Sequence, residues 1–313
     1  MKLSQAIDVY VRRRQGAGWR FDGQARQLRS FLRQHGDAEL RRITAIRVAA
    51  FLNGSGVRPS TWNQKRGTLK VFFEYWAVCG QVKTSPVPPN ALKYTQDFVP
   101  YIFSHSELRR LVEAVPKCQR RSSCVMSAAT FRSLLLFLYG TGMRVGEALR
   151  LRLTDVNLEL SMVTVRGTKF YKSRLVPLGR DVRELVQRYL ELPAKQNQHD
   201  RPLFQTKSAN PIRLRVLDKS FVRLRRLARV ERHDESSFQP RVHDLRHSFA
   251  VHRVTEWYRQ NADVQRLLPA LSTYLGHVDL KSTQRYLTMA PELLEQANRR
   301  FERYVCGGAN EKR

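Results

Sequence analysis

Four prolines between residues 86 and 100 divide this chain of 313 residues into two parts. Pro86, Pro88, Pro89 and Pro100 lie in one short segment, and proline at this density cannot sustain a helix. The chain is long enough for two ordinary domains, each with a core of its own. We therefore predict an N-terminal domain over residues 1–82, a proline-rich linker over 83–100 and a second domain over 101–313.

The N-terminal part carries apolar residues at helical spacing throughout. One amphipathic segment begins at Leu3, and two more begin near Ala25 and Ile46. Ser60 is predicted to cap a fourth helix, which ends at Gly80. The pattern predicts a small, wholly helical domain.

The second part predicts a mostly helical domain with one small sheet. Ser104 begins a capping box and so marks a helix start. Residues 162–166 and 174–178 alternate in polarity on either side of a basic stretch, 167–173, which predicts a β-hairpin with a basic tip. The expected fold class is mainly α with a small β-sheet, in which the second domain is α+β.

The charge of the chain points to a polyanionic partner. There are 56 Lys and Arg against 27 Asp and Glu, a formal net charge of +29. This excess destabilises the folded chain by self-repulsion unless a polyanion neutralises it, and DNA or RNA would do so through counterion release. The basic residues lie along amphipathic helices, which disfavours a basic tail. Candidate DNA contacts in the N-terminal domain are Arg12, Arg13, Lys65, Arg66 and Lys70, although a solvated helix face is the commoner role for any one of them.

Other function classes are disfavoured by what the composition lacks. The four cysteines show no C-x-x-C spacing, so we expect free thiols, no zinc site and no cofactor. The start of the chain has no apolar core of a signal peptide, and the longest apolar run, 134–139, is too short to cross a membrane. We expect an intracellular protein without membrane contact, in the bacterial cytoplasm at the nucleoid.

Arg144 follows a Gly-Thr-Gly turn and is predicted to open a helix over 145–152. A helix N-terminus presents free N–H groups that can hold a phosphate. A guanidinium adds two parallel donors to the phosphate oxygens. Taken alone, Arg144 could equally be a solvated arginine beside a turn.

Two histidines and a second arginine extend this set. His243 and Arg246 are spaced i and i+3 on a predicted helix, so they share one face. Arg246 could hold the same phosphate, and His243 could exchange a proton with it; a buried, structural His243 is an equally weighted alternative. Gly276 is predicted to end a helix and release His277 into a loop.

Tyr286 follows on the next predicted helix. A phenol is a weak nucleophile at its ordinary pKa, and surrounding cations with a histidine in reach would favour the phenolate. The usual role of such a tyrosine is a half-buried aromatic. Lys169 on the hairpin tip could protonate a leaving 5′ oxygen. Lys172 on the same tip remains the alternative and is also a candidate DNA contact.

In this order the motifs resemble the tyrosine recombinase (phage integrase) family over essentially the whole chain. The resemblance implies a helical, SAM-like core-binding domain followed by a catalytic domain. It implies two phosphate-binding arginines, a lysine general acid, two histidines that assist proton transfer, and a tyrosine that becomes joined to a DNA 3′ phosphate. These are Arg144 with Arg246, then Lys169, then His243 with His277, then Tyr286, while Glu147 and Asp155 match supporting positions.

The activity that the resemblance implies is site-specific DNA recombination, as integration and excision or as transposition, through a 3′-phosphotyrosine. The stretch from His247 to His277 looks longer than in Xer proteins and carries an extra-looking segment, 256–261. Such a form resembles integrases of transposons and related mobile elements. Alternatives are Xer-type chromosome or plasmid dimer resolution, an accessory DNA-binding recombinase, and a nicking-closing enzyme like a type IB topoisomerase. Expected partners are double-stranded DNA with paired sites, a homotetramer in which the predicted helix 291–305 reaches a neighbour, and a partner recombinase or directionality factor.

Overall fold

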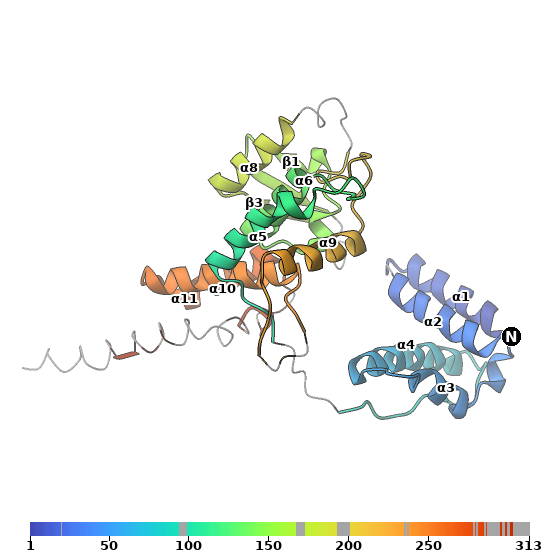
Figure 1. Cartoon of the computed structure of the whole chain (residues 1–313). Coiled ribbons are helices and arrows are strands. Elements are labelled where there is room, and N and C mark those ends of the chain that lie inside the picture. The colour runs from blue at the N-terminus through green and yellow to red at the C-terminus, as the bar shows by residue number, and fades with distance from the viewer. Residues whose placement is uncertain are drawn as a thin grey trace, which may run out of the picture. The chain divides into compact units, whose positions relative to one another are not determined.

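The fold was analysed on a computed structural model that describes residues 1–313 except 20, 94–98, 167–172, 193–200, 235, 237, 278, 280, 285, 287–294, 296–297, 299–300 and 303–313. The chain forms two compact units, Met1–Gln96 and Asp97–Arg313 (Figure 1). Both are helical and the second adds a small sheet, which confirms the predicted fold class. None of the helices in the described residues has the length and apolar character needed to cross a bilayer.

The first unit packs four helices around an aromatic core. They are α1 (Leu3–Gly16), α2 (Asp22–His35), α3 (Ala45–Leu52) and α4 (Pro59–Val78), with a 3₁₀ turn at Leu40–Arg42. Helix α2 lies against the other three (Figure 1). The N-cap of α4 is Arg58 and not the predicted Ser60, because the fixed φ of Pro59 suits the first helical position. The rings of Tyr10, Phe31, Phe72 and Phe73 are almost completely buried there.

The described ends of the predicted linker are held by contacts. Val87 is buried in the core of the first unit. The guanidinium of Arg66 donates to the carbonyls of Pro88 and Pro89. At the other end, Arg232 of the second unit donates to the Val99 carbonyl at 2.7 Å. Each end of the segment is therefore fastened to its own unit.

The second unit is built around α6, which contacts α5, α7, α8 and α10. Helix α6 carries apolar residues on most of its faces, and a helix of this kind must lie inside the fold. The capping box predicted at Ser104 is confirmed at the start of α5. The helices are α5 (His105–Cys118), α6 (Ala128–Thr141), α7 (Val145–Ala148), α8 (Arg180–Leu190), α9 (Leu214–Leu227), α10 (Asp244–Arg259), α11 (Val264–Leu275) and α12 (Lys281–Gln284).

The small sheet has three antiparallel strands in the order β1-β2-β3. The predicted hairpin is confirmed as β2 (Met162–Val165) and β3 (Arg174–Pro177), with Val163 opposite Val176. Both of these valines are buried, as period-2 alternation requires. Strand β1 (Val156–Asn157) was not predicted, because two residues carry no periodic signal.

Helix α7 is shorter than the predicted 145–152. Beyond Ala148 the chain pairs with a distant segment instead of continuing the helix. The Leu203 N–H donates to the Leu151 carbonyl at 2.7 Å, and the Leu153 N–H donates to the Arg201 carbonyl at 2.9 Å. These long-range bonds take the backbone groups that a longer helix would use.

Candidate active site

Arg144 lies at the first turn of α7, directly after a sharp turn. Gly142 ends α6 with a φ of 58°, a conformation that glycine adopts without strain. The guanidinium of Arg144 then donates from Nη1 to Glu147 at 3.0 Å and from Nη2 to the Gly276 carbonyl at 2.6 Å. Because 37% of its side chain stays exposed, Arg144 is held from one side and open to solvent on the other.

Arg246 lies in the first turn of α10 and is buried. Its Nη1 donates to the Gly142 carbonyl at 2.8 Å, and its Nη2 donates to the Leu275 carbonyl at 2.9 Å. Burial lowers the pKa of Arg246 to about 10, so the side chain remains charged at neutral pH. The two arginines thus bind neighbouring carbonyls, those of Leu275 and Gly276.

These carbonyls belong to the C-terminus of α11. Gly276 ends the helix in the left-handed region with a φ of 71°, and the His277 N–H donates back to the Ser272 carbonyl at 3.0 Å. The chain then leaves the helix axis, as predicted for His277. The His277 Nδ1 lies 2.7 Å from the Thr283 hydroxyl, which fixes the ring.

Both predicted histidines are poor proton acceptors in the free protein. Burial, followed by the positive charges of Arg246 and Arg144, lowers the pKa of His277 to about 4. Burial, followed by the charge of Arg246, also lowers the pKa of His243, which caps α10. At neutral pH both rings are therefore neutral and can donate or accept a hydrogen bond.

Tyr286 lies two residues beyond α12, between two imidazole rings. Its ring centroid is 5.9 Å from that of His277, nearly parallel, and 5.6 Å from that of His247. Only 3% of the residue is exposed. The phenol is also near enough to Arg246 that its charge, once ionised, would raise the pKa of that guanidinium.

The buried carboxylate of Glu147 contacts two arginines of the site. Glu147 is 5% exposed and accepts from Arg144 and from Arg174 of β3. Burial alone would raise the pKa of Glu147, but the bonds and charges of these two arginines outweigh it and hold the pKa below its usual value. The site therefore keeps a surplus of fixed positive charge, which suits an anion such as a phosphodiester. Among the described residues no three His, Cys, Asp or Glu side chains are grouped to hold a metal ion.

Comparison with known proteins decides what this cluster belongs to. The model of the phage integrase family matches residues 102–292, which include every residue of the cluster. The chain belongs to this family of tyrosine recombinases. Such an enzyme breaks and rejoins DNA, so site-specific recombination is the activity that family membership implies.

Individual relatives support the same assignment. This tyrosine recombinase is 34% identical to a Sinorhizobium fredii protein named as an integrase/recombinase, y4rB, over 96% of both chains. It is 31% identical to the tyrosine recombinase XerC of Staphylococcus carnosus over 79% of this chain and 77% of that protein. Its fold resembles that of a lambda integrase dimer bound to a COC′ core site, with a TM-score of 0.66 and 20% identity, covering 93% and 97% of the chains. At that identity the likeness supports the fold alone.

Two residues of the recombinase site escaped the sequence analysis. Arg174 reaches Glu147 from β3, and its only signal was its place at the base of the basic hairpin. The His247 ring lies 5.2 Å from that of His243 and next to Tyr286. The repeated histidine in His243-Asp244-Leu245-Arg246-His247 was the signal that could have found it.

The predicted general acid cannot be placed in the recombinase site. Lys169 and its alternative Lys172 both lie outside the described residues. The strands on either side are fixed, however. Arg166 donates to Asp155 at 2.7 Å at the end of β2, and Arg174 opens β3.

The DNA-binding residues predicted in the first unit separate into two groups. Arg12 and Arg13 are exposed, and Lys70 is 45% exposed beside Glu74. Lys65 instead donates to the Phe51 carbonyl at 3.1 Å and lies over the Phe51 ring. Arg66 is 9% exposed and spends its donors on proline carbonyls. The prediction for Arg66 is therefore corrected, because the guanidinium is buried and its Nε and Nη2 already donate to carbonyls of the same unit.

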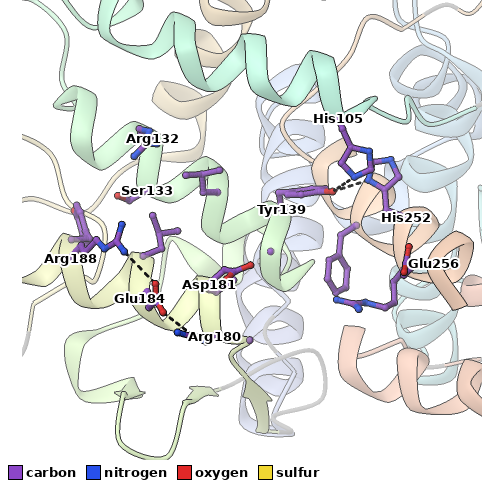
Figure 2. A pocket seen from close by; sticks show the side chains of 18 of the residues that line it. His105, Arg132, Ser133, Tyr139, Arg180, Asp181, Glu184, Arg188, His252 and Glu256 are labelled. Atoms are coloured by element: carbon purple, nitrogen blue, oxygen red, sulfur yellow. Dashed lines mark hydrogen bonds and ion pairs between the residues drawn. The ribbon is translucent and has the colours of Figure 1, made fainter. Parts of the chain in front are cut away.

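A separate pocket of about 1050 Å³ lies between α6, α8 and α10 (Figure 2). On one side the rings of His105 and His252 stack at 4.4 Å, and the Tyr139 hydroxyl lies 2.8 Å from the His252 Nδ1. On the other side Glu184 pairs with two arginines of α8. The catalytic candidates do not line this pocket, so it is distinct from the recombinase site.

Proposed function

We propose that this tyrosine recombinase exchanges DNA strands between two sites through Tyr286. The phenol oxygen attacks the scissile phosphorus and the bond from phosphorus to the 5′ oxygen breaks. The products are a 3′-phosphotyrosine and a 5′ hydroxyl. A 5′ hydroxyl of the partner duplex then attacks the phosphotyrosine and releases Tyr286. One phosphoester bond forms as another breaks in each step, so no external energy source is required.

Arg144 and Arg246 are the proposed phosphate ligands. Negative charge increases on the phosphate as the fifth bond forms, and fixed guanidinium groups stabilise that charge without reorganising. The support for this role is that both arginines are held by the same helix end, at the carbonyls of Leu275 and Gly276. That shared support is the observation on which the proposal chiefly rests.

Proton transfer is assigned to the remaining residues. Tyr286 must lose a proton when it attacks, and the leaving 5′ oxygen must gain one. We assign the second proton to Lys169, with Lys172 as the alternative. His243 and His277, neutral at pH 7, are proposed to hydrogen-bond the phosphate, whose negative charge would raise their pKa values toward neutrality, and one of them is proposed to accept the proton that Tyr286 loses.

For the biological role we favour integration, excision or transposition of a mobile element. The support is the match to y4rB over 96% of both chains, against 79% of this chain for XerC. Xer-type dimer resolution is the second candidate because of the 31% identity to XerC. A site recovered at the ends of an element would favour the first role, and a chromosomal or plasmid resolution site the second.

We further propose that four protomers assemble on paired sites in the cytoplasm. The predicted helix 291–305, most of which lies outside the described residues, would reach a neighbouring protomer. Deletion of residues 291–313 is then expected to impair cooperative assembly on two sites more than binding to one site. Equal loss of both would refute the exchange of this segment.

The direct test is to recover DNA that stays attached to the protein through boiling in detergent. Cells that express the recombinase should yield attached fragments that share one sequence, and those fragments supply the unknown site. Strand exchange between two copies of that site would support a recombinase. Relaxation of plasmids without any site would favour a type IB topoisomerase, and binding without attachment would favour an accessory protein.

A further inference from the structure

Arg174 is the least exposed cation that reaches Glu147. It opens β3 directly after the hairpin tip, and 15% of its side chain is exposed, against 37% for Arg144. Its Nη1 and Nη2 donate to the two oxygens of Glu147 at 3.1 and 2.8 Å. A two-pronged pair of this kind fixes the angle of the carboxylate as well as its position.

The carboxylate that Arg174 fixes is the one that holds Arg144. The Glu147 Oε1 accepts from Arg144 Nη1 at 3.0 Å, and the Oε2 accepts from the Arg144 backbone N–H at 3.3 Å. Glu147 therefore lies between two guanidinium groups, the more exposed one of Arg144 and the largely covered one of Arg174. If Arg174 were absent, both oxygens would be free to pair with Arg144 alone.

A second set of bonds joins the same residues through the end of α11. Three consecutive carbonyls accept from three arginines. Arg174 Nε donates to Tyr274 at 3.3 Å, Arg246 Nη2 donates to Leu275 at 2.9 Å, and Arg144 Nη2 donates to Gly276 at 2.6 Å. The free carbonyls and the negative end of a helix attract cations, so the turn orders the three guanidinium groups side by side.

Close packing leaves little tolerance in this arrangement. A Cβ at position 276 would lie 3.0 Å from the guanidinium carbon of Arg174. Arg174 thus presses against the turn whose carbonyl holds Arg144. A shift of Arg174 would therefore displace Arg144 in two ways, by moving the Glu147 carboxylate and by moving the turn at Gly276.

We propose that Arg174 is a positioning residue for the phosphate site, a role that rests on the proposed function of Arg144. By occupying Glu147, Arg174 prevents the carboxylate from neutralising Arg144 and keeps the remaining donors of Arg144 directed at the phosphate. Arg174 also fastens the base of the hairpin to the same site. The base of the hairpin and the arginine that holds the phosphate are therefore joined by one carboxylate, Glu147.

The test compares Arg174→Met with Arg174→Lys and with a matched control, Arg166→Met. Arg166 lies at the other strand of the same hairpin and also pairs with a buried carboxylate, Asp155, but does not contact Glu147. The first measurement needs no DNA: the NMR signal of the Arg144 Nε–H, assigned with an Arg144→Lys spectrum. We expect it to shift and broaden in Arg174→Met and to stay in place in Arg166→Met. An unmoved signal in Arg174→Met would overturn the proposal, whatever the protein does to DNA.

The second measurement is the rate of covalent attachment at saturating protein, on a site recovered as described above. Misplacing a group that aligns the reactants by about 1 Å costs on the order of 100-fold in rate, so we expect a loss of about 10- to 100-fold for Arg174→Met. DNA affinity should change by less than about threefold, because the phosphate contact of one residue is a small part of the interface. Arg174→Lys should recover part of the rate, because lysine keeps the positive charge but cannot donate two parallel hydrogen bonds to the carboxylate.

A neutral phosphate separates positioning from folding. If the scissile phosphate is replaced by a methylphosphonate, there is less charge for Arg144 to stabilise, so the penalty of Arg174→Met should shrink by at least about 10-fold. An undiminished penalty, or an equal loss in Arg166→Met, would show that Arg174 serves only the fold. Failure of the wild-type protein to attach DNA would instead refute the proposed function, and the NMR result would still decide the role of Arg174.

Discussion

The guanidinium of Arg246 donates to the Leu275 carbonyl at 2.9 Å, across 29 residues of sequence. This bond ties the start of α10 to the end of α11, and a second bond from the same side chain reaches the turn after α6. A charged group at the meeting point of three helices serves function at a cost to stability, because burial already lowers its pKa.

Arg246→Gln should separate these two effects. The neutral amide removes the desolvated charge and its repulsion from Arg144 and can still donate to one of the two carbonyls. We expect the free energy of unfolding to be unchanged or higher by about 1 kcal/mol, while covalent attachment to DNA is lost. Denaturant unfolding and attachment assays on the same preparation check this. A loss of stability above about 3 kcal/mol would show that the charge itself holds the helices together.

Tyr286→Phe should abolish covalent attachment and leave DNA binding intact. The phenylalanine ring keeps the contacts with His247 and His277 but has no oxygen to attack phosphorus. Gel-shift titration and detergent-resistant attachment on the recovered site measure the two properties. Tyr258→Phe, on the distal part of α10, is the matched control and should attach DNA at the normal rate. Attachment by the Tyr286→Phe protein would exclude Tyr286 as nucleophile.

His277 should titrate far below neutrality in the free protein. Its pKa is about 4 because of burial and of the charges of Arg246 and Arg144, against an ordinary value of 6.5. As the pH falls, the unfolded chain binds a proton at this histidine before the folded chain does. The contribution of His277 to the free energy of unfolding is therefore fully present above pH 6.5 and is lost as the pH falls toward 4. Proton NMR titration checks the value. Arg144→Gln should raise the pKa, and no change on that substitution would contradict the assigned cause.

Gly142→Ala should destabilise the second unit. A Cβ at this position would lie 2.3 Å from the Phe249 ring, in a backbone conformation that favours glycine. Together these effects predict a loss of about 2 to 4 kcal/mol in the free energy of unfolding. Gly146→Ala in α7 is the control, because its Cβ would meet the nearest atom at 3.5 Å. Equal effects in the two variants would argue against the role of the Phe249 contact.

Substitutions of Arg66 and Arg12 should have their effects in different assays. Arg66→Met removes the hydrogen bonds that a buried charged side chain donates to the carbonyls of Pro88 and Pro89. We therefore expect the free energy of unfolding of the first unit to fall by about 2 to 3 kcal/mol. Arg12→Met should leave stability unchanged, weaken DNA binding and reduce the salt dependence of binding by about one ion. Thermal unfolding and binding titrations at several salt concentrations distinguish the two. An intact fold with a reduced salt slope in Arg66→Met would restore Arg66 to the DNA contacts.

Local patterns in the sequence predicted the elements that local physics controls. The apolar spacing of α1 to α4, the capping box at Ser104, the β2–β3 hairpin and the helix end at Gly276 each depend on neighbours a few residues away. Where the structure departs from these predictions, the cause is a contact with residues far away in the chain. Helix α7 ends early because the chain beyond it pairs with residues 201–203, and Arg66 turned out to be buried because the proline segment folds back over it.

The sequence by itself determined that a helical, strongly basic chain carries Arg144, His243, Arg246, His277 and Tyr286 in the order found in tyrosine recombinases. These are choices of residue type, and they are visible without coordinates. Only the tertiary structure decided that Glu147 is shared by two arginines, that three guanidinium groups bind one helix end, and that Tyr286 lies between His247 and His277. Such contacts join residues far apart in the chain, and no periodic pattern records which of many arginines will meet a given carboxylate or carbonyl.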